Sequence, residues 1–139
     1  MTLAITVTHE GGRKVDARIG EFVVRTDQSR EGGGEGSAPE PYMLFLASLA
    51  ACAGIYVVGF CEARSIPTGS IRIVQDHDFD EKTGRLLAVR MAVEVGPEFP
   101  AKYVQAIARV ASMCAVKRTI DNPPEFTVET RITSQPSHP

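Results

Sequence analysis

The sequence predicts an α+β domain with the element order β-β-β-α-β-β-α-β, and three observations support this prediction. A long segment that starts at Pro41 is apolar on all sides, which is typical of a helix in the middle of a fold. Short runs of alternating apolar and polar residues lie before and after it and indicate strands. A second segment, residues 99–114, carries apolar residues at helical spacing. Because strands and helices do not alternate one for one, mostly antiparallel pairing is expected.

The N-terminal part is expected to form three strands and a loop. Residues 3–9 alternate between apolar and polar side chains, and residues 14–18 and 21–26 form two more short runs that meet near Gly20. Residues 27–40 include four glycines and indicate a flexible connector. A phosphate-binding loop is disfavoured, because neither a GxGxxG nor a GKS/T pattern follows a strand here.

The central helix is expected to begin at Pro41 and to run to about Arg64, with no charged residue before Glu62. Its length would allow a membrane span. However, no basic flank precedes it and the rest of the chain reads as ordinary strands and helices, so a buried central helix is the preferred interpretation. A helix that is apolar all round needs cover on every side, which a chain of 139 residues cannot easily supply. We therefore expect a homodimer that buries this helix between two sheets.

The C-terminal half is expected to begin with a hairpin, formed by strands over residues 71–78 and 87–95 around a turn at residues 81–84. The second helix is expected to bend or be capped near Cys114 and to continue as a short helix to Ile120. A last strand is expected where apolar and polar residues alternate, at Phe126, Val128 and Thr130. Residues 1–139 would then form a single domain, with residues 133–139 as a frayed tail.

Composition narrows the functional classes. The net charge of -2 gives no electrostatic reason to expect nucleic acid or an anionic membrane as a partner. The N-terminal ten residues lack the pattern of a signal peptide, and three cysteines without paired spacing do not resemble a secreted disulfide framework. A cytoplasmic protein with reduced thiols is therefore expected.

The cysteines are the candidate reactive groups. Cys52 and Cys61 are nine residues apart, which places them on opposite sides of one helix at about 100° per residue. Cys114 lies on the inner face of the second helix, so the candidate pair is Cys52 with Cys114. For each of them an inert buried cysteine remains the alternative. A metal site or a Cys–His hydrolytic pair is disfavoured, because the chain has no CxxC and its three histidines are scattered, at His9, His77 and His138.

The segment APEPYMLFLASLAAC, which ends at Cys52, resembles the central-helix signature of the OsmC and organic hydroperoxide resistance (Ohr) family. In that family a proline lies eleven residues before a reactive cysteine, as Pro41 does here. The segment Met113-Cys114-Ala115-Val116 resembles the family's Cys-Pro/Ser-Val segment, although alanine follows the cysteine. The loop from Asp27 to Gly34 resembles the branch with a shorter N-terminal region, and the predicted element order also fits.

The resemblance implies an OsmC-like fold, an intertwined homodimer with active sites at the subunit interface, and a thiol-dependent peroxidase that reduces organic hydroperoxides to alcohols in oxidative-stress defence. Cys52 would be the attacking thiolate, and Cys114 would resolve its sulfenic acid as a disulfide. A dithiol such as a reduced lipoyl group would restore both thiols. No metal or organic prosthetic group is implied.

A buried apolar helix raises the pKa of a thiol, so a cation is expected near Cys52. The family uses an arginine from the N-terminal strands, held by a glutamate at the start of the central helix. Arg13 matches this arginine best in sequence, and the alternatives are Arg18, Arg25 and Arg30. The positions of the glutamate are occupied by Tyr42 and Met43, and Glu40 is the candidate substitute.

Two further functions are kept as alternatives. An OsmC-like dimer could bind a small apolar ligand or a protein thiol with little turnover, which the missing glutamate favours. A hotdog-type acyl-thioester hydrolase would also wrap a sheet around a central helix. It is disfavoured by the second helix and by the lack of a carboxylate inside the central helix before Glu62.

Overall fold

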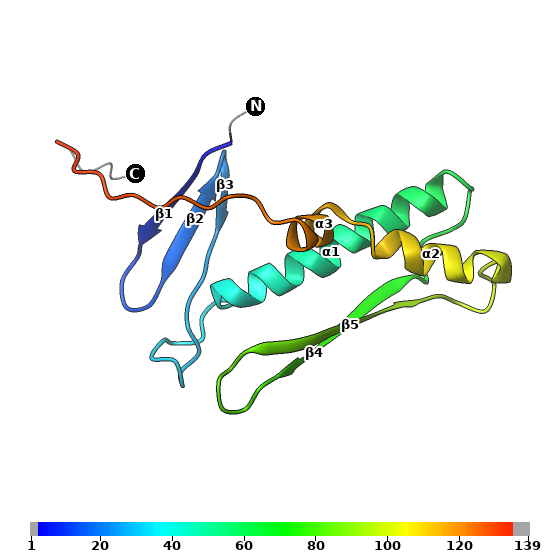
Figure 1. The fold of residues 1–139 in the computed structure, drawn as a ribbon, viewed down its shortest axis with the longest axis horizontal. Coiled ribbons are helices and arrows are strands. Elements are labelled where there is room, and N and C mark those ends of the chain that lie inside the picture. The colour runs from blue at the N-terminus through cyan, green and yellow to red at the C-terminus, as the bar shows by residue number, and fades with distance from the viewer. Residues whose placement is uncertain (1–2, 135–139) are drawn as a thin grey trace.

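The computed structural model describes residues 3–134, so the prediction of a frayed tail falls mainly on residues 135–139, outside the described range. Figure 1 shows one long helix, a hairpin and two shorter helices that lie along it, and a separate three-stranded sheet near its N-terminal end. All described strand pairs are antiparallel. The predicted α+β class is therefore confirmed.

The N-terminal sheet has the order β1-β2-β3, with β1 at Ile5–His9, β2 at Val15–Ile19 and β3 at Phe22–Val24. Gly20 has a φ of 59° and makes the tight turn between β2 and β3, where an L side chain would be strained. Many apolar side chains of this part of the chain are exposed: Leu3, Ile5, Val7, Phe22 and Val23. The sheet therefore lacks a complete apolar cover within the described chain.

The glycine-rich loop is organised around Asp27, which is fully buried. Its carboxylate accepts hydrogen bonds from the backbone amides of Gln28 at 2.8 Å, Glu35 at 3.3 Å and Ser37 at 3.0 Å, and from the Ser37 hydroxyl at 2.6 Å. These bonds, led by those from Ser37, lower the pKa of Asp27 from 3.8 to about 2. The segment is therefore held by a buried carboxylate and is not the flexible connector that its glycines indicate.

Helix α1 spans Pro41–Glu62, within two residues of its predicted end, and Pro41 occupies its first turn. One side of α1 is buried in the core through Leu46, Leu49, Ala53, Val57, Phe60 and Cys61. The other side is open, and 69% of the Ile55 side chain is exposed. By length and composition α1 could cross a membrane, since an 18-residue window has a mean hydropathy of 2.2. Only 28% of that window is buried inside the chain. The prediction that α1 is covered on every side is therefore met on one side only within a single chain.

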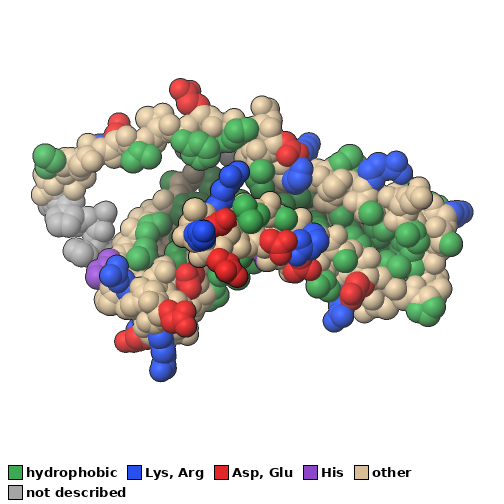
Figure 2. All heavy atoms as spheres, turned by 60° about the horizontal axis from the view of Figure 1, so that its bottom comes forward, with side chains coloured by type: hydrophobic (Ala, Val, Ile, Leu, Met, Phe, Trp, Pro, Cys, Tyr) green, Lys and Arg blue, Asp and Glu red, His purple; other side chains and the backbone are tan. Residues whose placement is uncertain are grey.

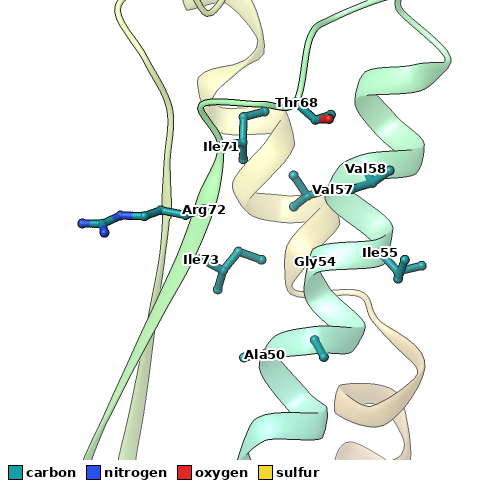
Figure 3. A pocket seen from close by; sticks show the side chains of 10 residues that line it. Ala50, Gly54, Ile55, Val57, Val58, Thr68, Ile71, Arg72 and Ile73 are labelled. Carbon is teal, nitrogen blue, oxygen red and sulfur yellow. The ribbon is translucent and has the colours of Figure 1, made fainter.

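The hairpin consists of β4 (Arg72–Phe79) and β5 (Leu86–Glu94), with a bulge at Asp78/Phe79. Its two faces differ, because alternate side chains point to opposite sides of a sheet. Ile73 points toward α1 while Arg72 points away from it, as Figure 3 shows. On the outer face Arg90 forms ion pairs with Asp76 and Asp78, each at 2.6 Å. The hairpin therefore covers one side of α1 with apolar residues and carries charges on its other face.

The second helical segment is divided as predicted near Cys114. A 3-10 turn, η1 (Ala101–Tyr103), leads into α2 (Val104–Ala111), and α3 (Ala115–Asp121) follows after a break at residues 112–114. Phe99 and Ile107 enter the core that α1 shares with α2 and α3, so the predicted apolar face is also confirmed. The core residues are Leu49, Ala53, Val57, Phe60, Cys61, Phe99, Ile107, Ala111 and Cys114.

The prediction of a last strand at Phe126, Val128 and Thr130 is wrong for the single chain. Residues 123–133 form no strand, and 80% of Phe126 and 96% of Val128 are exposed. The physical reason is that a strand needs a hydrogen-bonding neighbour, and within residues 3–134 no strand pairs with this segment. In Figure 1 the segment runs away from α3 as an extended chain toward the end of the molecule that holds the N-terminal sheet.

Candidate functional site

The candidate site lies where α3 begins against the middle of α1. Cys52 lies midway along α1 and is partly exposed. Cys114 is the N-cap residue of α3 and is fully buried. Its Sγ accepts a hydrogen bond from the backbone amide of Lys117 at 3.4 Å and lies 4.0 Å from the carbonyl oxygen of Leu49. The sequence thus positions Cys114 through its role as a helix cap, with the thiol turned toward α1.

The structure brings the predicted cysteine pair together. The Cys114 thiol lies near enough to Cys52 to lower the pKa of that thiol, and both cysteines are free thiols. Proximity of two thiols is what a reversible disulfide requires. Cys52 and Cys114 are 62 residues apart in the sequence, and the contact between α1 and α3 makes them neighbours.

The surroundings of Cys52 lower its pKa below the usual thiol value. The largest contribution is a hydrogen bond from the backbone amide of Val116, and the Cys114 thiol, the Ala115 amide and the positive charge of Arg118 act in the same direction. Burial opposes them, as predicted for an apolar helix. The thiolate, which is the nucleophilic form of cysteine, is therefore favoured at Cys52.

Cys61 lies apart from this pair. It is fully buried in the core, and burial raises the pKa of its thiol, with a smaller opposing effect from Arg64. Cys61 is not among the groups that act on Cys52. The three cysteines therefore divide into a pair with favoured ionisation at Cys52 and one inert core residue.

The predicted arginine and glutamate do not reach Cys52 within the single chain. Arg13 lies in the turn between β1 and β2, where its guanidinium lies beside Gly33 of the loop. Glu40 is the N-cap residue of α1 and makes no side-chain capping bond. Neither contributes to the electrostatics of Cys52 here. Their roles stay predictions, as do those of the alternatives Arg18 in β2 and Arg25 and Arg30 in the loop.

Two residues at the site escaped the sequence analysis. Arg118 donates a hydrogen bond from Nη2 to the hydroxyl of Tyr56 at 3.0 Å, and its charge acts on Cys52. A signal for both residues exists, because Tyr56 is four residues after Cys52 and Arg118 is four residues after Cys114. Positions i and i+4 share one face of a helix, so each cysteine carries one of these residues on its own face.

An apolar pocket of about 250 Å³ lies near Cys114, although neither Cys52 nor Cys114 is among the residues that line it. Leu49, whose carbonyl oxygen lies next to Cys114, forms part of its wall. Side chains of β5, α2 and the start of α3 complete the lining: Val89, Met91, Val93, Ala108, Ala111, Ser112 and Lys117. Among residues 3–134 no group of three or more His, Cys, Asp or Glu side chains lies close enough together to hold a metal ion.

The chain is thus a small α+β domain with a thiol pair where a short capped helix meets a long apolar one. Residues 34–129 match the family model described as OsmC-like protein, and the chain belongs to this family. A search of curated protein sequences found no significant match.

Solved structures share the fold over most of the chain. The OsmC-like protein of Mycoplasma pneumoniae is 15% identical, with 88% of this chain and 89% of that one covered and a TM-score of 0.70. An organic hydroperoxide resistance protein OsmC from Legionella pneumophila is 20% identical, with 88% and 90% covered and a TM-score of 0.59. The organic hydroperoxide resistance protein OhrB of Bacillus subtilis is 22% identical, with 88% and 93% covered and a TM-score of 0.55. At these identities the likeness establishes the fold.

Proposed function

We propose that the protein is a thiol-dependent peroxidase that reduces organic hydroperoxides to alcohols in oxidative-stress defence. The Cys52 thiolate attacks the terminal oxygen of the hydroperoxide, so that an S–O bond forms and the O–O bond breaks. The departing alkoxide takes a proton and becomes the alcohol, and Cys52 becomes a sulfenic acid. Cys114 then attacks the Cys52 sulfur, an S–S bond forms, and water leaves with the Cys114 proton.

The observation that carries this proposal is that the N-cap thiol Cys114 of α3 lies near Cys52 on α1, and that the pKa of Cys52 is lowered there. An inert cysteine buried in an apolar helix would have a raised pKa, as Cys61 has. The proximity of Cys114 would also let it resolve a sulfenic acid on Cys52. The names of the Legionella and Bacillus relatives point to the same class of substrate.

The apolar pocket near Cys114 supports an organic hydroperoxide over hydrogen peroxide. Aliphatic side chains of α1, β5 and α2 form most of its wall, and Ser112 and Lys117 complete it. An alkyl group in this pocket would lose contact with water, which contributes about 0.8 kcal/mol per buried methylene. Hydrogen peroxide has no apolar part that could gain this energy.

The catalytic cycle would need an external reductant and no resident cofactor. A dithiol such as a reduced lipoyl group would attack the Cys52–Cys114 disulfide, donate two electrons and leave as a cyclic disulfide. This reductant is an expectation from the family, and a cytoplasmic location, where thiols are kept reduced, is proposed with it.

The test is a free-thiol count on the reduced protein before and after one equivalent of cumene hydroperoxide. We expect a rapid loss of two thiols per chain and a peptide that joins Cys52 to Cys114. Cys52→Ser should abolish peroxide consumption, and Cys114→Ser should consume one equivalent and then stop. Cys61→Ser is the matched control and should consume peroxide at nearly the wild-type rate. Equal loss of activity in the Cys52 and Cys61 variants would contradict the assignment.

The second candidate function is an OsmC-like dimer that binds a small apolar ligand or a protein thiol with little turnover. The observation in its favour is the pair Tyr42 and Met43, which occupy the positions of the family's glutamate. Three thiols that survive an equivalent of hydroperoxide would support this function and contradict the peroxidase.

We also propose that the protein is a homodimer in which a second copy covers α1. Figure 3 shows an apolar hollow of about 530 Å³ between α1 and the start of β4, with small residues such as Ala50 and Gly54 on its helical wall. Small residues allow close approach of another backbone, and the neighbouring Ile55 is exposed. A bilayer is a poor occupant, since the open edges of the hairpin would carry unpaired backbone groups into the lipid. A monomeric mass in detergent-free buffer at micromolar concentration would contradict this proposal.

The charge balance of the sequence gives no reason to expect nucleic acid as a partner. The chain carries 15 Lys and Arg against 17 Asp and Glu. Several of the cations are paired with carboxylates, as Lys14 is with Glu35 and Lys117 is with Asp121. In Figure 2 blue and red side chains lie next to each other on the face shown, with apolar side chains between them. The proposed partners are therefore a second copy, the hydroperoxide and the dithiol.

A further inference from the structure

Each cysteine of the pair has a polar neighbour one helical turn further on. On α1, Tyr56 follows Cys52 by four residues, and on α3, Arg118 follows Cys114 by four. Side chains at this spacing lie on the same face of a helix. Because α1 and α3 contact each other, the thiol pair and the polar pair lie side by side. The guanidinium of Arg118 donates a hydrogen bond to the Tyr56 hydroxyl at 3.0 Å and so links α3 to α1 one turn beyond the cysteines.

We propose that Arg118, positioned by the hydroxyl of Tyr56, is the cation that stabilises the Cys52 thiolate in this protein. The inference rests on the proposed peroxidase function, in which Cys52 must ionise. It gives the site a cation from within the chain, on the same short helix as Cys114. Tyr56 is a positioning residue in this arrangement, since it holds a long and otherwise mobile side chain toward α1.

The electrostatics of Cys52 agree with this geometry. The backbone amide of Val116 lowers the pKa of Cys52 most, and Arg118 acts in the same direction with a smaller effect. Within residues 3–134 Arg118 is the only charged side chain among the groups that shift this pKa. Burial of Cys52 acts in the opposite direction. Arg13, the cation expected from sequence, does not take part in the single chain. The guanidinium of Arg118 therefore supplies the positive charge that an apolar helix lacks.

The other elements packed on α1 bring no competing charge to Cys52. The titratable groups that act on this thiol are Cys114 and Arg118, and Tyr56 is the partner of Arg118. The ammonium of Lys117, also on α3, is paired with Asp121. The face of α2 in the core consists of apolar residues such as Ile107. On β4 the only inward titratable group is His77, which is hydrogen-bonded to Gln75, and Gln75 in turn donates to the Leu46 carbonyl nearer the start of α1.

Arg118 is largely exposed, so water and salt screen its charge and its effect is expected to be moderate. A solvent-exposed charge typically changes the ionisation equilibrium of a neighbouring group by a factor of about two to five. Removal of the charge should raise the pKa of Cys52 and slow its alkylation near neutral pH by that factor. In about 1 M salt, where the Debye length falls to about 3 Å, the difference should nearly disappear.

The experiment measures the rate of Cys52 alkylation by iodoacetamide as a function of pH, in the folded full-length chain. All variants carry Cys61→Ala, because residues 31–64 contain no internal Lys or Arg and a tryptic peptide would otherwise hold both thiols. Arg118→Gln should slow alkylation two- to fivefold, Arg118→Lys should retain most of the rate, and Tyr56→Phe should give a smaller decrease. Arg109→Gln removes one exposed positive charge from α2 and should leave the profile unchanged.

Two results would overturn the inference. One is an Arg118→Gln profile that coincides with that of the parent, and the other is an equal shift from Arg109→Gln. If Arg118→Gln fails to fold by circular dichroism, Tyr56→Phe decides, since it removes a single oxygen atom and an unchanged rate would contradict the positioning role. Peroxide consumption is measured in parallel. A shifted alkylation profile without any consumption would contradict the proposed peroxidase while leaving the role of Arg118 in place.

Discussion

Ile55→Asp is the sharpest test of the proposed dimer. Ile55 lies midway along α1 on the side that points away from β4, as Figure 3 shows, and 69% of its side chain is exposed in the single chain. It makes a minor contribution to the core of the single chain, so the substitution should leave the folded chain intact. In a dimer built on this face of α1, each copy would bury one aspartate in an apolar contact.

The size of the effect follows from the exposed fraction. Burial of a whole isoleucine side chain contributes about 1.5 to 3 kcal/mol, so covering the exposed 69% of Ile55 should contribute about 1 to 2 kcal/mol per copy. A symmetric dimer contains the contact twice, which gives about 2 to 4 kcal/mol, or a factor of about 30 to 1000 in the dissociation constant. A buried unpaired carboxylate adds several kcal/mol to this loss.

The assay is the concentration dependence of the mass by sedimentation velocity, from nanomolar to high micromolar protein. Wild type should be dimeric throughout the micromolar range, and Ile55→Asp should be a folded monomer. Val74→Asp is the matched control. Val74 is another exposed aliphatic residue, on the same outer face of the hairpin as Arg72 and Asp76, and its substitution should leave the dimer in place. A dimer of unchanged affinity in Ile55→Asp would refute the argument from the open face of α1.

Three further predictions concern the loop and the core. Gly34→Ala should destabilise the protein by about 1 to 3 kcal/mol in urea unfolding, because its Cβ would overlap the Gln28 carbonyl oxygen and lie 2.6 Å from Asp27 Oδ1. Gly69→Ala, whose Cβ would meet nothing within 4 Å, is the control and should change the stability by less than about 0.5 kcal/mol. The pKa of Asp27 is about 2 in the folded protein, against an ordinary value of 3.8, so its ionised carboxylate should stabilise the fold fully above pH 4 and lose this effect as the pH falls toward 2. Asp27→Asn should be less stable than wild type at pH 7 and should lack this loss of stability in acid. Cys61, whose pKa is raised by burial, should be the last thiol that iodoacetamide modifies at any pH, and prior reaction of Cys61 would contradict its place in the core.

The sequence was sufficient for those parts of the fold that depend on local patterns. The strand predicted at residues 87–95 is β5 at Leu86–Glu94, and the helix expected from Pro41 is α1. For β5 the alternation of apolar residues reports which face is buried, and the structure follows it. For α1 the signal was its length and the proline at its start, since the helix is apolar on all sides. The last strand failed because alternation predicts an extended conformation but does not identify a neighbouring edge. A strand forms only where such an edge is available.

For the candidate site, too, the sequence was sufficient only for features that depend on local spacing. The spacing of Cys52 and Cys61 placed the two thiols on opposite sides of one helix, and in the structure Cys61 is buried in the core while Cys52 is partly exposed. The amides of Ala115 and Val116 could not be predicted, since they reach Cys52 only because α3 begins against the middle of α1. That contact depends on packing between elements far apart in the chain, and the periodicity of neither helix contains it.

Three parts of the single chain are incomplete in ways that fit one another. The open side of α1 needs an apolar cover, and the N-terminal sheet carries apolar side chains that lack one. The extended segment 123–133 lacks a strand neighbour, while both sheets have open edges. A two-fold arrangement lets each copy supply what the other lacks, so that every such contact forms twice. The family resemblance implies an arginine of the N-terminal strands at the thiol, and Arg13 does not act on Cys52 within one chain. Arg13 of a second copy and Arg118 are then two candidate cations for one site. If both act, alkylation of Cys52 should be slower in monomeric Ile55→Asp than in the dimer, and Arg118→Gln should slow it further in either form.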